Sequence, residues 1–429
     1  MGNPVSTWWR SSRFQAAIKK GNEQKAQEIL HKIENSGAKL APLEKLFQQK
    51  LKLNDSLSFY QRELASATNR LSVSEPHDID SLTIEPKLID SIRASFRLAE
   101  HDVGKIQVTG IEPQVFDELE TNLAIFLDRE FKKIPAEALD SALVTAIQDL
   151  DELENGGNPR YNSKLSPYVY LLKYFPQSFY SNYLAWFLVY ESGLMPKELK
   201  ILDIGAGLGT VAYSLVGFLQ TCSRFLSLPN LHISYYSLEK EPLLQFRGLQ
   251  FWRKSAEHQQ VATNIYFRFD TADIFEHDNR EQNLPAKFFN FIVISQCFFT
   301  EQTARIKSHQ VYRELFQNSL ADGGYVLLVA QGKLLYQAYQ LEPQEDIYQE
   351  ENLIQMFLEE LGLELEWYKY VTSTGKRIPL DLIEKRKFIQ ENLTTMKYLN
   401  PLKRQYLNQN FDSSYFIDSY IILAKKVVD

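Results

Sequence analysis

The sequence predicts an α/β protein, with a Rossmann-like, doubly wound parallel sheet preceded by an all-helical N-terminal domain. Three observations support this fold class. After residue 156, short apolar runs alternate with helical patterns, as expected for parallel strands covered by helices on both faces. A glycine-rich turn joins one of these runs to an apolar helix. Before residue 155, the hydrophobic spacing is mainly that of helices.

The N-terminal part, residues 1–155, has helical patterns that leave a loop over residues 72–83. Its expected helices lie at residues 14–30 (interrupted by Gly21-Asn22), 43–71, 86–99, 113–131 and 135–153. The Asn-Gly-Gly-Asn-Pro run at residues 155–159 is the clearest boundary. We therefore expect a helical domain over 1–155, which recruits a substrate or partner, and a second domain over 156–429.

The second domain begins with an aromatic-rich helical stretch over residues 168–195, broken at Pro176. The strands that follow are short and apolar without alternation, which is typical of buried parallel strands. We expect strands at 200–204, 232–238, 265–269, 291–294, 325–330, 365–371 and 420–425, and helices at 210–226, 242–254 and 305–319.

Composition limits the possible chemistry. The chain has 429 residues, of which 44% are hydrophobic, and a formal net charge of -7. This mild acidity argues against a protein that coats nucleic acid by charge alone. The two cysteines, Cys222 and Cys297, exclude a disulfide framework, a four-cysteine zinc site and a cysteine-held iron–sulfur cluster. Because no signal peptide or long uncharged apolar run is recognisable, we expect a cytoplasmic location and no membrane contact.

The most informative segment is ILDIGAGLGT at residues 201–210. Glycine at three alternate positions, Gly205, Gly207 and Gly209, allows a tight bend and close approach of a ligand to the backbone. The dinucleotide fingerprint needs a further glycine where Thr210 stands, which disfavours a nicotinamide-linked oxidoreductase. The P-loop pattern fails as well, because no Gly-Lys-Ser/Thr follows.

This segment resembles motif I of the class I S-adenosylmethionine-dependent methyltransferases. Further matches follow in the same order as in that superfamily. They are an acid, Glu239, at the end of the second strand; acids after the third strand; a stretch similar to motif IV at residues 288–296; and an L-x-x-G-G turn at residues 320–324. The resemblance covers about residues 199–425 and implies a seven-stranded methyltransferase sheet.

The same resemblance implies S-adenosylmethionine as cofactor and assigns roles to individual residues. Asp203 would lie under the methionine amino group, directly or through water, and Gly205, Ala206, Gly207 and Gly209 would make room for the cofactor. Glu239 would accept hydrogen bonds from both ribose hydroxyls, because its two oxygens are acceptors. Asp273, with Asp270 as the alternative, would accept from the adenine amino group. Ser295 and Gln296 would face the methionine portion and the substrate, as would Tyr183.

The reaction implied is transfer of the sulfonium methyl group by one in-line displacement, without a metal. The catalytic residues stay open. The SQCFF segment at residues 295–299 differs from the Asn/Asp-Pro-Pro-Tyr/Phe turn of methyltransferases that act on amino groups of adenine or glutamine. It also lacks the Pro-Cys pair of the enzymes that methylate cytosine at C5. Cys297 is therefore interpreted as core packing rather than as a nucleophile, and Cys222 likewise. The methyl acceptor is RNA, a protein or a small molecule.

An insertion near residues 372–419 separates the last two expected strands. Residues 369–404 hold nine basic and three acidic residues, whereas residues 334–368 hold nine acidic residues and no Lys or Arg. Basic and aromatic residues together can bind RNA phosphates and bases. The alternative is a solvated helical insertion that neutralises its acidic neighbour.

Residues 168–183, together with motif I, resemble the methyltransferase-like assembly factors of the mitochondrial small ribosomal subunit. Lys173 stands near the place of that family's arginine, but the family's metal-binding cysteines are absent. This keeps a second hypothesis open, in which the chain is a non-catalytic binding or assembly factor that uses the fold as a scaffold.

Overall fold

The computed structural model describes residues 13–14, 17, 23–34, 81–102, 104–112, 115–226, 231–256, 263–275, 284–408 and 415–427. The chain forms two compact units, Met1–Asp78 and Ile79–Asp429. In the first unit, helix α2 (Glu23–Glu34) buries Ala26 and Leu30 against Phe14 and Ala17, in line with the helical pattern over residues 14–30. The helix expected over 43–71 and most of the loop expected over 72–83 lie outside the described residues.

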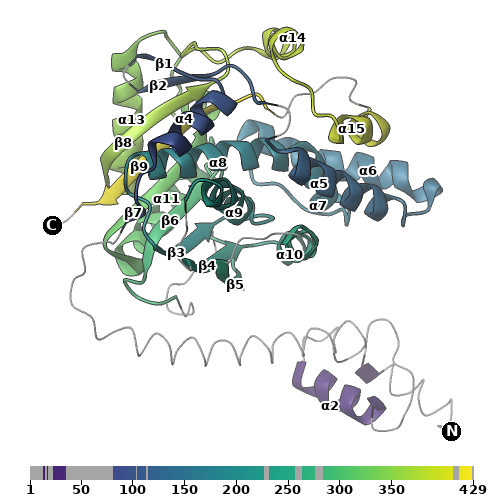
Figure 1. Ribbon diagram of the computed structural model, residues 1–429. Coiled ribbons are helices and arrows are strands. Elements are labelled where there is room, and N and C mark those ends of the chain that lie inside the picture. Colours follow the sequence, from purple (N-terminus) through teal and green to yellow (C-terminus); the bar gives the residue numbers. More distant parts are fainter. Residues whose placement is uncertain are drawn as a thin grey trace. The chain divides into compact units, whose positions relative to one another are not determined.

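In the second unit, the described strands form one nine-stranded sheet in the order β1-β2-β8-β9-β7-β6-β3-β4-β5 (Figure 1). Strand β9 is antiparallel to both of its neighbours, and β1 is antiparallel to β2, whereas the other neighbours are parallel. The strands are β1 (Leu98–Asp102), β2 (Lys105–Val108), β3 (Glu198–Ile204), β4 (Leu231–Glu239), β5 (Thr263–Thr271), β6 (Phe289–Ser295), β7 (Leu320–Gln331), β8 (Leu363–Thr372) and β9 (Asp418–Lys426).

The order β5-β4-β3-β6-β7 places the first strand of the predicted domain, β3, in the middle of the sheet. The chain then winds outward in one direction through β4 and β5, and in the other through β6 and β7. This is the doubly wound arrangement, whose ligands bind beyond the carboxyl ends of the strands where the winding reverses. All seven expected strands are present, so the predicted α/β sheet is confirmed.

Two strands were not expected. Residues 98–108 form β1 and β2, and β2 pairs with β8 so that Ile106 lies opposite Val371. The prediction of an all-helical segment before residue 155 is therefore wrong here. Helix α4 (Pro86–Ser95) ends early because Arg97 has a left-handed φ of 47°, which reverses the chain into the hairpin. The boundary expected at 155 also falls inside the unit Ile79–Asp429.

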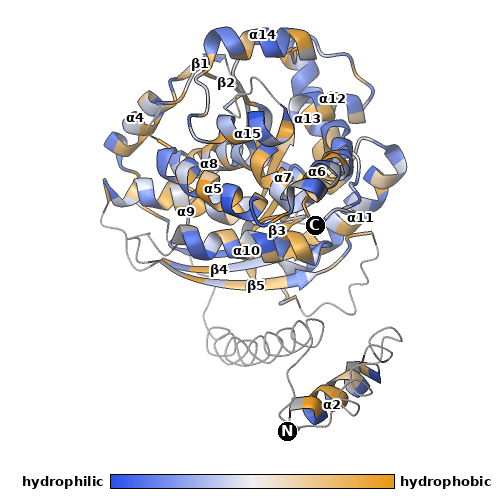
Figure 2. Ribbon diagram, turned by 90° about the vertical axis from the view of Figure 1, so that its right-hand side faces the viewer, coloured by the Kyte–Doolittle hydropathy of each residue, from blue (hydrophilic) through white to orange (hydrophobic). Residues whose placement is uncertain are grey.

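Helices cover both faces of the sheet, and Figure 2 shows α8 and α9 on one side of the strands and α11 to α13 on the other. Helix α8 (Phe175–Glu191) is buried over almost its whole circumference, including Trp186 and Tyr180. The other covering helices are α5 (Asp117–Phe131), α6 (Ala136–Asp151), α7 (Ser166–Lys173), α9 (Thr210–Ser223), α10 (Pro242–Ala256), α11 (Gln302–Ser319), α12 (Gly332–Ala338) and α13 (Ile347–Leu361). Within the described ranges, no helix is long and apolar enough to cross a bilayer.

The insertion before the last strand is helical, with α14 (Leu382–Asn392) and α15 (Leu399–Leu407). Helix α15 is held to the body through Glu120, a buried residue of α5. The Glu120 carboxylate accepts a 3.0 Å hydrogen bond from the backbone N–H of Leu399. The first turn of α15 is thereby tied to a helix that comes nearly 280 residues earlier in the chain.

Candidate functional site

A cleft of about 760 Å³ opens at the carboxyl edge of the sheet. Small-molecule sites typically have volumes of about 300–1,000 Å³. Six of the nine residues that the resemblance assigns to the cofactor site line this cleft: Gly205, Gly207, Glu239, Asp273, Ser295 and Gln296. The structure therefore brings together the ends of β3, β4, β5 and β6, as a site at the reversal point of the winding requires.

The glycine turn forms one side of the cleft. Gly205, Gly207 and Gly209 all have left-handed φ values, 67°, 54° and 82°, which residues with a β-carbon rarely adopt. A β-carbon on Gly209 would meet no atom within 4 Å, and one on Gly207 would meet only the Tyr170 hydroxyl, at 4.0 Å. A β-carbon on Gly205 would lie 2.5 Å from Cys297 Sγ. Open space thus borders the backbone at Gly207, whereas glycine at 205 is required by packing.

Glu239 ends β4 beside this turn and is only 6% exposed. Its Oε2 accepts a 2.8 Å hydrogen bond from the N–H of Gly207, and its Oε1 accepts a 2.9 Å bond from the N–H of Glu241. Burial raises the pKa of Glu239, and the two N–H donors oppose that shift. A carboxylate oxygen can accept two hydrogen bonds, so each oxygen keeps one acceptor position.

Of the two acids considered after the third strand, Asp273 lines the cleft, and Asp270 is not among the lining residues. Asp273 Oδ1 accepts a 2.8 Å hydrogen bond from the N–H of Phe275, which fixes the side chain in a tight local turn. Asp270 instead has its Oδ2 3.5 Å from Arg268 Nε. The geometry therefore favours Asp273.

Asp203 is not among the residues that line the cleft, so a contact with the methionine amino group, directly or through water, stays a prediction. Its side chain is 1% exposed, and its carboxyl group accepts a hydrogen bond from the Tyr235 hydroxyl on the neighbouring strand. Burial raises the pKa of Asp203 to about 8. Ala206 and Gly209 are also absent from the lining, and Gly209 serves as the N-cap of α9.

Ser295 is the last residue of β6 and Gln296 follows it, and both line the cleft. Ser295 Oγ accepts a 2.8 Å hydrogen bond from Asn182 Nδ2, and Gln296 has a left-handed φ of 58°. Tyr183 does not face the cleft, because it is 2% exposed and donates to Thr221 Oγ1 at 2.9 Å. Its expected place near the substrate is wrong.

Cys297 lines the cleft and is half-buried, with its sulfur packed beside Gly205 and the Tyr312 hydroxyl, whereas Cys222 is buried as expected. The sequence pattern around Cys297 was apolar on its C-terminal side, which suggested a core position. Burial nevertheless raises the pKa of the Cys297 thiol to about 11, which keeps it protonated at neutral pH. A thiol in that state is a poor nucleophile.

Two further residues of the cleft were missed in the sequence. Tyr170, on α7, places its hydroxyl next to the glycine turn, and burial raises its pKa to about 12. Asp418 is the first residue of β9 and lines the opposite wall. Because β9 is antiparallel, its beginning lies at the same edge as the carboxyl ends of the parallel strands. This topology, rather than a pattern in the sequence, identifies Asp418.

Asp418 is held by one strong contact, because the Tyr370 hydroxyl donates a 2.6 Å hydrogen bond to its Oδ1. Burial raises the pKa of Asp418, and the bond from Tyr370 works in the opposite direction. A buried carboxyl group with a raised pKa binds a proton more readily than an exposed one does, which suits it to act as a general base.

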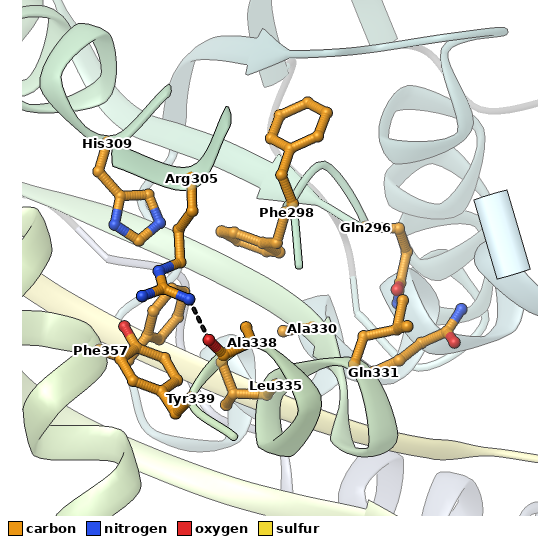
Figure 3. A pocket seen from close by; sticks show the side chains of 12 residues that line it. Gln296, Phe298, Arg305, His309, Ala330, Gln331, Leu335, Ala338, Tyr339 and Phe357 are labelled. Atoms are coloured by element: carbon orange, nitrogen blue, oxygen red, sulfur yellow. Dashed lines mark hydrogen bonds between the residues drawn. The ribbon is translucent and has the colours of Figure 1, made fainter. Parts of the chain in front are cut away.

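A second cavity, of only about 20 Å³, lies beside the cleft and shares Gln296, Phe298 and Gln331 with it (Figure 3). Here Arg305 donates to the carbonyl oxygen of Ala338, as the dashed line in Figure 3 shows. His309 lies beside Arg305, with its Nδ1 3.1 Å from Glu360 Oε2.

Burial lowers the pKa of His309 to about 4, so this imidazole is neutral and its role is packing. No group of His, Cys, Asp and Glu residues in the described part of the chain is suited to hold a metal ion.

No protein-family model and no curated protein matches this sequence. The fold is similar to several solved structures. A methyltransferase from Methanosarcina mazei matches 55% of this chain and 95% of its own, with 13% identity and a TM-score of 0.30. The plantazolicin methyltransferase, solved with SAH, matches 70% of this chain and 100% of its own, with 16% identity and a TM-score of 0.27.

A glycopeptide N-methyltransferase, solved with S-adenosylmethionine, matches 58% of this chain and 94% of its own, with 13% identity and a TM-score of 0.27. All three are methyltransferases. Since identities this low concern the fold alone, the function of this chain has to be argued from its own residues.

Proposed function

We propose that this chain is an S-adenosylmethionine-dependent methyltransferase. One observation carries the proposal. The glycine turn after β3, Glu239 at the end of β4 and Asp273 after β5 line a single cleft, in the order in which the superfamily resemblance assigns them to the methionine, ribose and adenine portions. Each of these residues alone is common at strand ends, but their convergence on one cleft of ligand size is not.

The residues present fit the cofactor. There is open space on the side of Gly207 where a β-carbon would point, because an atom built there would meet only the Tyr170 hydroxyl, at 4.0 Å. Glu239 keeps an acceptor position on each oxygen for the ribose hydroxyls. Asp273 keeps Oδ2 for the adenine amino group, since its described hydrogen bond uses Oδ1. Asp203 acts indirectly in this arrangement, by supporting the strand beneath the turn.

S-adenosylmethionine, when bound, would supply a methyl group on a sulfonium, an electrophile that an acceptor displaces in line with release of a neutral thioether. The protein's task is to position the acceptor and remove its proton. We assign the removal of the acceptor's proton to the carboxylate of Asp418. Cys297 and Tyr170 keep their own protons at neutral pH because burial raises their pKa values to about 11 and about 12.

Calorimetric titration with S-adenosylmethionine tests the proposal. We expect binding by the full chain and its loss in Gly207→Arg, because an arginine there would fill the space next to the turn. Ser223→Arg, at an exposed position at the other end of α9, is the matched control and should bind normally. Failure of the unaltered chain to bind would favour the alternative of a non-catalytic assembly factor.

If binding is observed, transfer of labelled methyl groups into a cell extract fractionated into RNA, protein and small molecules identifies the acceptor class. The same experiment tests the proposed role of the N-terminal part. Deletion of residues 1–78, which form a compact unit of their own, should reduce transfer to a partner that this unit recruits and leave cofactor binding unchanged.

A further inference from the structure

We propose that residues 153–161, in the connection between α6 and α7, form a strap that lies over the bound cofactor and holds it in the cleft, with Lys240 as the residue that positions the strap. The sequence marks the middle of this segment only as a domain boundary. The inference rests on the proposed function, because the cofactor is its ligand, and deepens that function by adding a segment to the site.

The strap forms one wall of the cleft. Every residue of the strap except Arg160 lines it. Gly207 and Glu239 line the same cleft, so the strap borders the space assigned to the cofactor. A wall that consists of connecting chain rather than of helix or strand can move without disturbing the sheet.

Two residues that follow strands of the sheet hold the strap. Lys240, directly after β4, donates from Nζ to Asn158 Oδ1 and, at 3.0 Å, to the carbonyl oxygen of Pro159. Thr300, beyond the end of β6, donates from Oγ1 to the carbonyl oxygen of Asn155 at 2.8 Å. In the sheet order, β3 lies between β6 and β4. The strap therefore connects the two sides of the strand that carries the glycine turn.

The strap fits closely against Thr300. The N–H of Thr300 donates to the carbonyl oxygen of Gly156 at 3.2 Å. A β-carbon on Gly156 would lie 2.6 Å from Thr300 Cγ2, and Gly156 has a left-handed φ of 69°. Both the packing and the backbone therefore require glycine at this position. The Asn-Gly-Gly-Asn-Pro run is thus suited to a close contact with the edge of the sheet.

Tyr161 brings an aromatic ring to the side of the cleft where Glu239 lies. Lys240 Nζ is 5.7 Å from the centre of this ring, a cation–π contact that adds to its two hydrogen bonds. Burial raises the pKa of the Tyr161 hydroxyl, and the carboxylate of Glu239 raises it further. Because Lys240 directly follows Glu239, the strap lies at the ribose end of the proposed cofactor site.

The strap has few backbone hydrogen bonds of its own. The N–H groups of Gly156 and Gly157 donate to the carbonyl oxygens of Leu153 and Glu152. Within the described part of the chain, the N–H groups of Asn158 and Tyr161 donate to no acceptor. Segments with so few bonds open locally at a small cost in free energy. The contacts with Lys240 and Thr300 therefore determine how fast the strap opens and how fast a bound cofactor leaves.

The rate of S-adenosylhomocysteine release tests the proposal on the full chain. Protein loaded with the tritiated compound is mixed with an excess of unlabelled compound, and loss of label is followed. Lys240→Met keeps an apolar side chain without donors, and we expect about tenfold faster release, as loss of one hydrogen bond from a charged group produces. Lys240→Arg keeps a cationic donor and should restore slow release in part. Lys164→Met, at an exposed position outside the cleft lining, is the control and should release normally.

Hydrogen exchange provides a second measurement on the same complexes. Saturation with S-adenosylhomocysteine should slow the exchange of the strap amides, because the ligand shields the N–H groups of Asn158 and Tyr161. In Lys240→Met this protection should shrink, whereas protection of the glycine turn at residues 205–209 should persist. Thr300→Val removes the other side-chain donor and should also speed release, so the test does not depend on the folding of one variant.

Two results would overturn this inference alone, in a protein that binds S-adenosylhomocysteine. One is unchanged exchange throughout residues 153–161 on binding. The other is release from Lys240→Met and Thr300→Val that is as slow as from the unaltered chain. A protein that does not bind S-adenosylhomocysteine would instead contradict the proposed function.

Discussion

The backbone N–H of Gly207 donates a 2.8 Å hydrogen bond to Glu239 Oε2. This bond joins the turn after the central strand to the end of the next strand, so the two parts of the proposed cofactor site form one unit. It also orients the Glu239 carboxylate before any ligand arrives. A preoriented acceptor costs less conformational entropy on binding.

The first prediction concerns this bond. In Glu239→Gln, one of the two acceptor oxygens becomes an NH₂ group that faces the N–H of Gly207 or Glu241. Two donors would then oppose each other, and we expect S-adenosylmethionine affinity to fall about tenfold or more. Calorimetry measures this loss. Glu241→Gln, at a neighbouring acid outside the cleft lining, is the control, and a similar loss there would remove the special role of Glu239.

A second prediction follows from the buried Asp203. Its folded pKa, about 8, lies above the ordinary value, so the folded state binds the proton more tightly than the unfolded state. The stabilisation is complete below the unfolded pKa, about 4, and is lost as the pH rises through about 8.

We therefore expect the free energy of unfolding to fall over that range, by at most about 1.4 kcal/mol per pH unit. Asp203→Asn should reduce this slope, because the amide oxygen can still accept from Tyr235 and does not ionise. Urea denaturation at pH 5 and pH 8 measures the difference. Equal slopes in both proteins would show that Asp203 is ionised throughout.

The third prediction tests Asp418 as the proton acceptor. The rate of methyl transfer should fall on the acidic side of its raised pKa, because the carboxyl group is then protonated. The Tyr370 hydroxyl lowers that pKa, so Tyr370→Phe should move the acidic limb of the pH–rate profile to higher pH. Asp418→Asn should remove the limb together with most of the rate. An unchanged limb in Tyr370→Phe, with normal stability, would assign the proton to another group.

The fourth prediction concerns the contact between Gly205 and Cys297. Gly205→Ala places a β-carbon 2.5 Å from Cys297 Sγ at a φ of 67°, and we expect a loss of stability of about 1–3 kcal/mol. Adding Cys297→Ala removes the sulfur and should recover part of this loss, whereas the backbone strain stays. Thermal unfolding of both single variants and the double variant measures the coupling. Additive effects would mean that the two positions relax independently.

The central sheet could be predicted from the sequence because each of its strands is a continuous apolar run. The turn after β3 could be predicted as well, because its left-handed backbone needs glycine and the glycines form a recognisable motif. Glu239 and Asp273 could be located because each lies at or just after the end of a predicted strand. Strands β1 and β2 were missed because they are short and are stabilised by pairing with β8, more than 260 residues away.

The burial of Asp203 in β3 and of Tyr183 in α8 could not be predicted, because the direction in which a side chain points depends on its tertiary neighbours. Tyr235 draws Asp203 into the sheet's interior, and Thr221 holds Tyr183. Asp418 was not recognised because its importance comes from the antiparallel direction of β9, which short apolar runs do not reveal.

The pairing of β2 with β8 also determines where the chain can be shortened. A fragment that starts at residue 156 would keep the whole glycine-turn region but lose both outer strands, leaving β8 with a free edge. Such an edge invites intermolecular strand pairing and aggregation. A fragment that starts at residue 79 keeps the hairpin as a cap, so it is the better choice for expression and crystallisation.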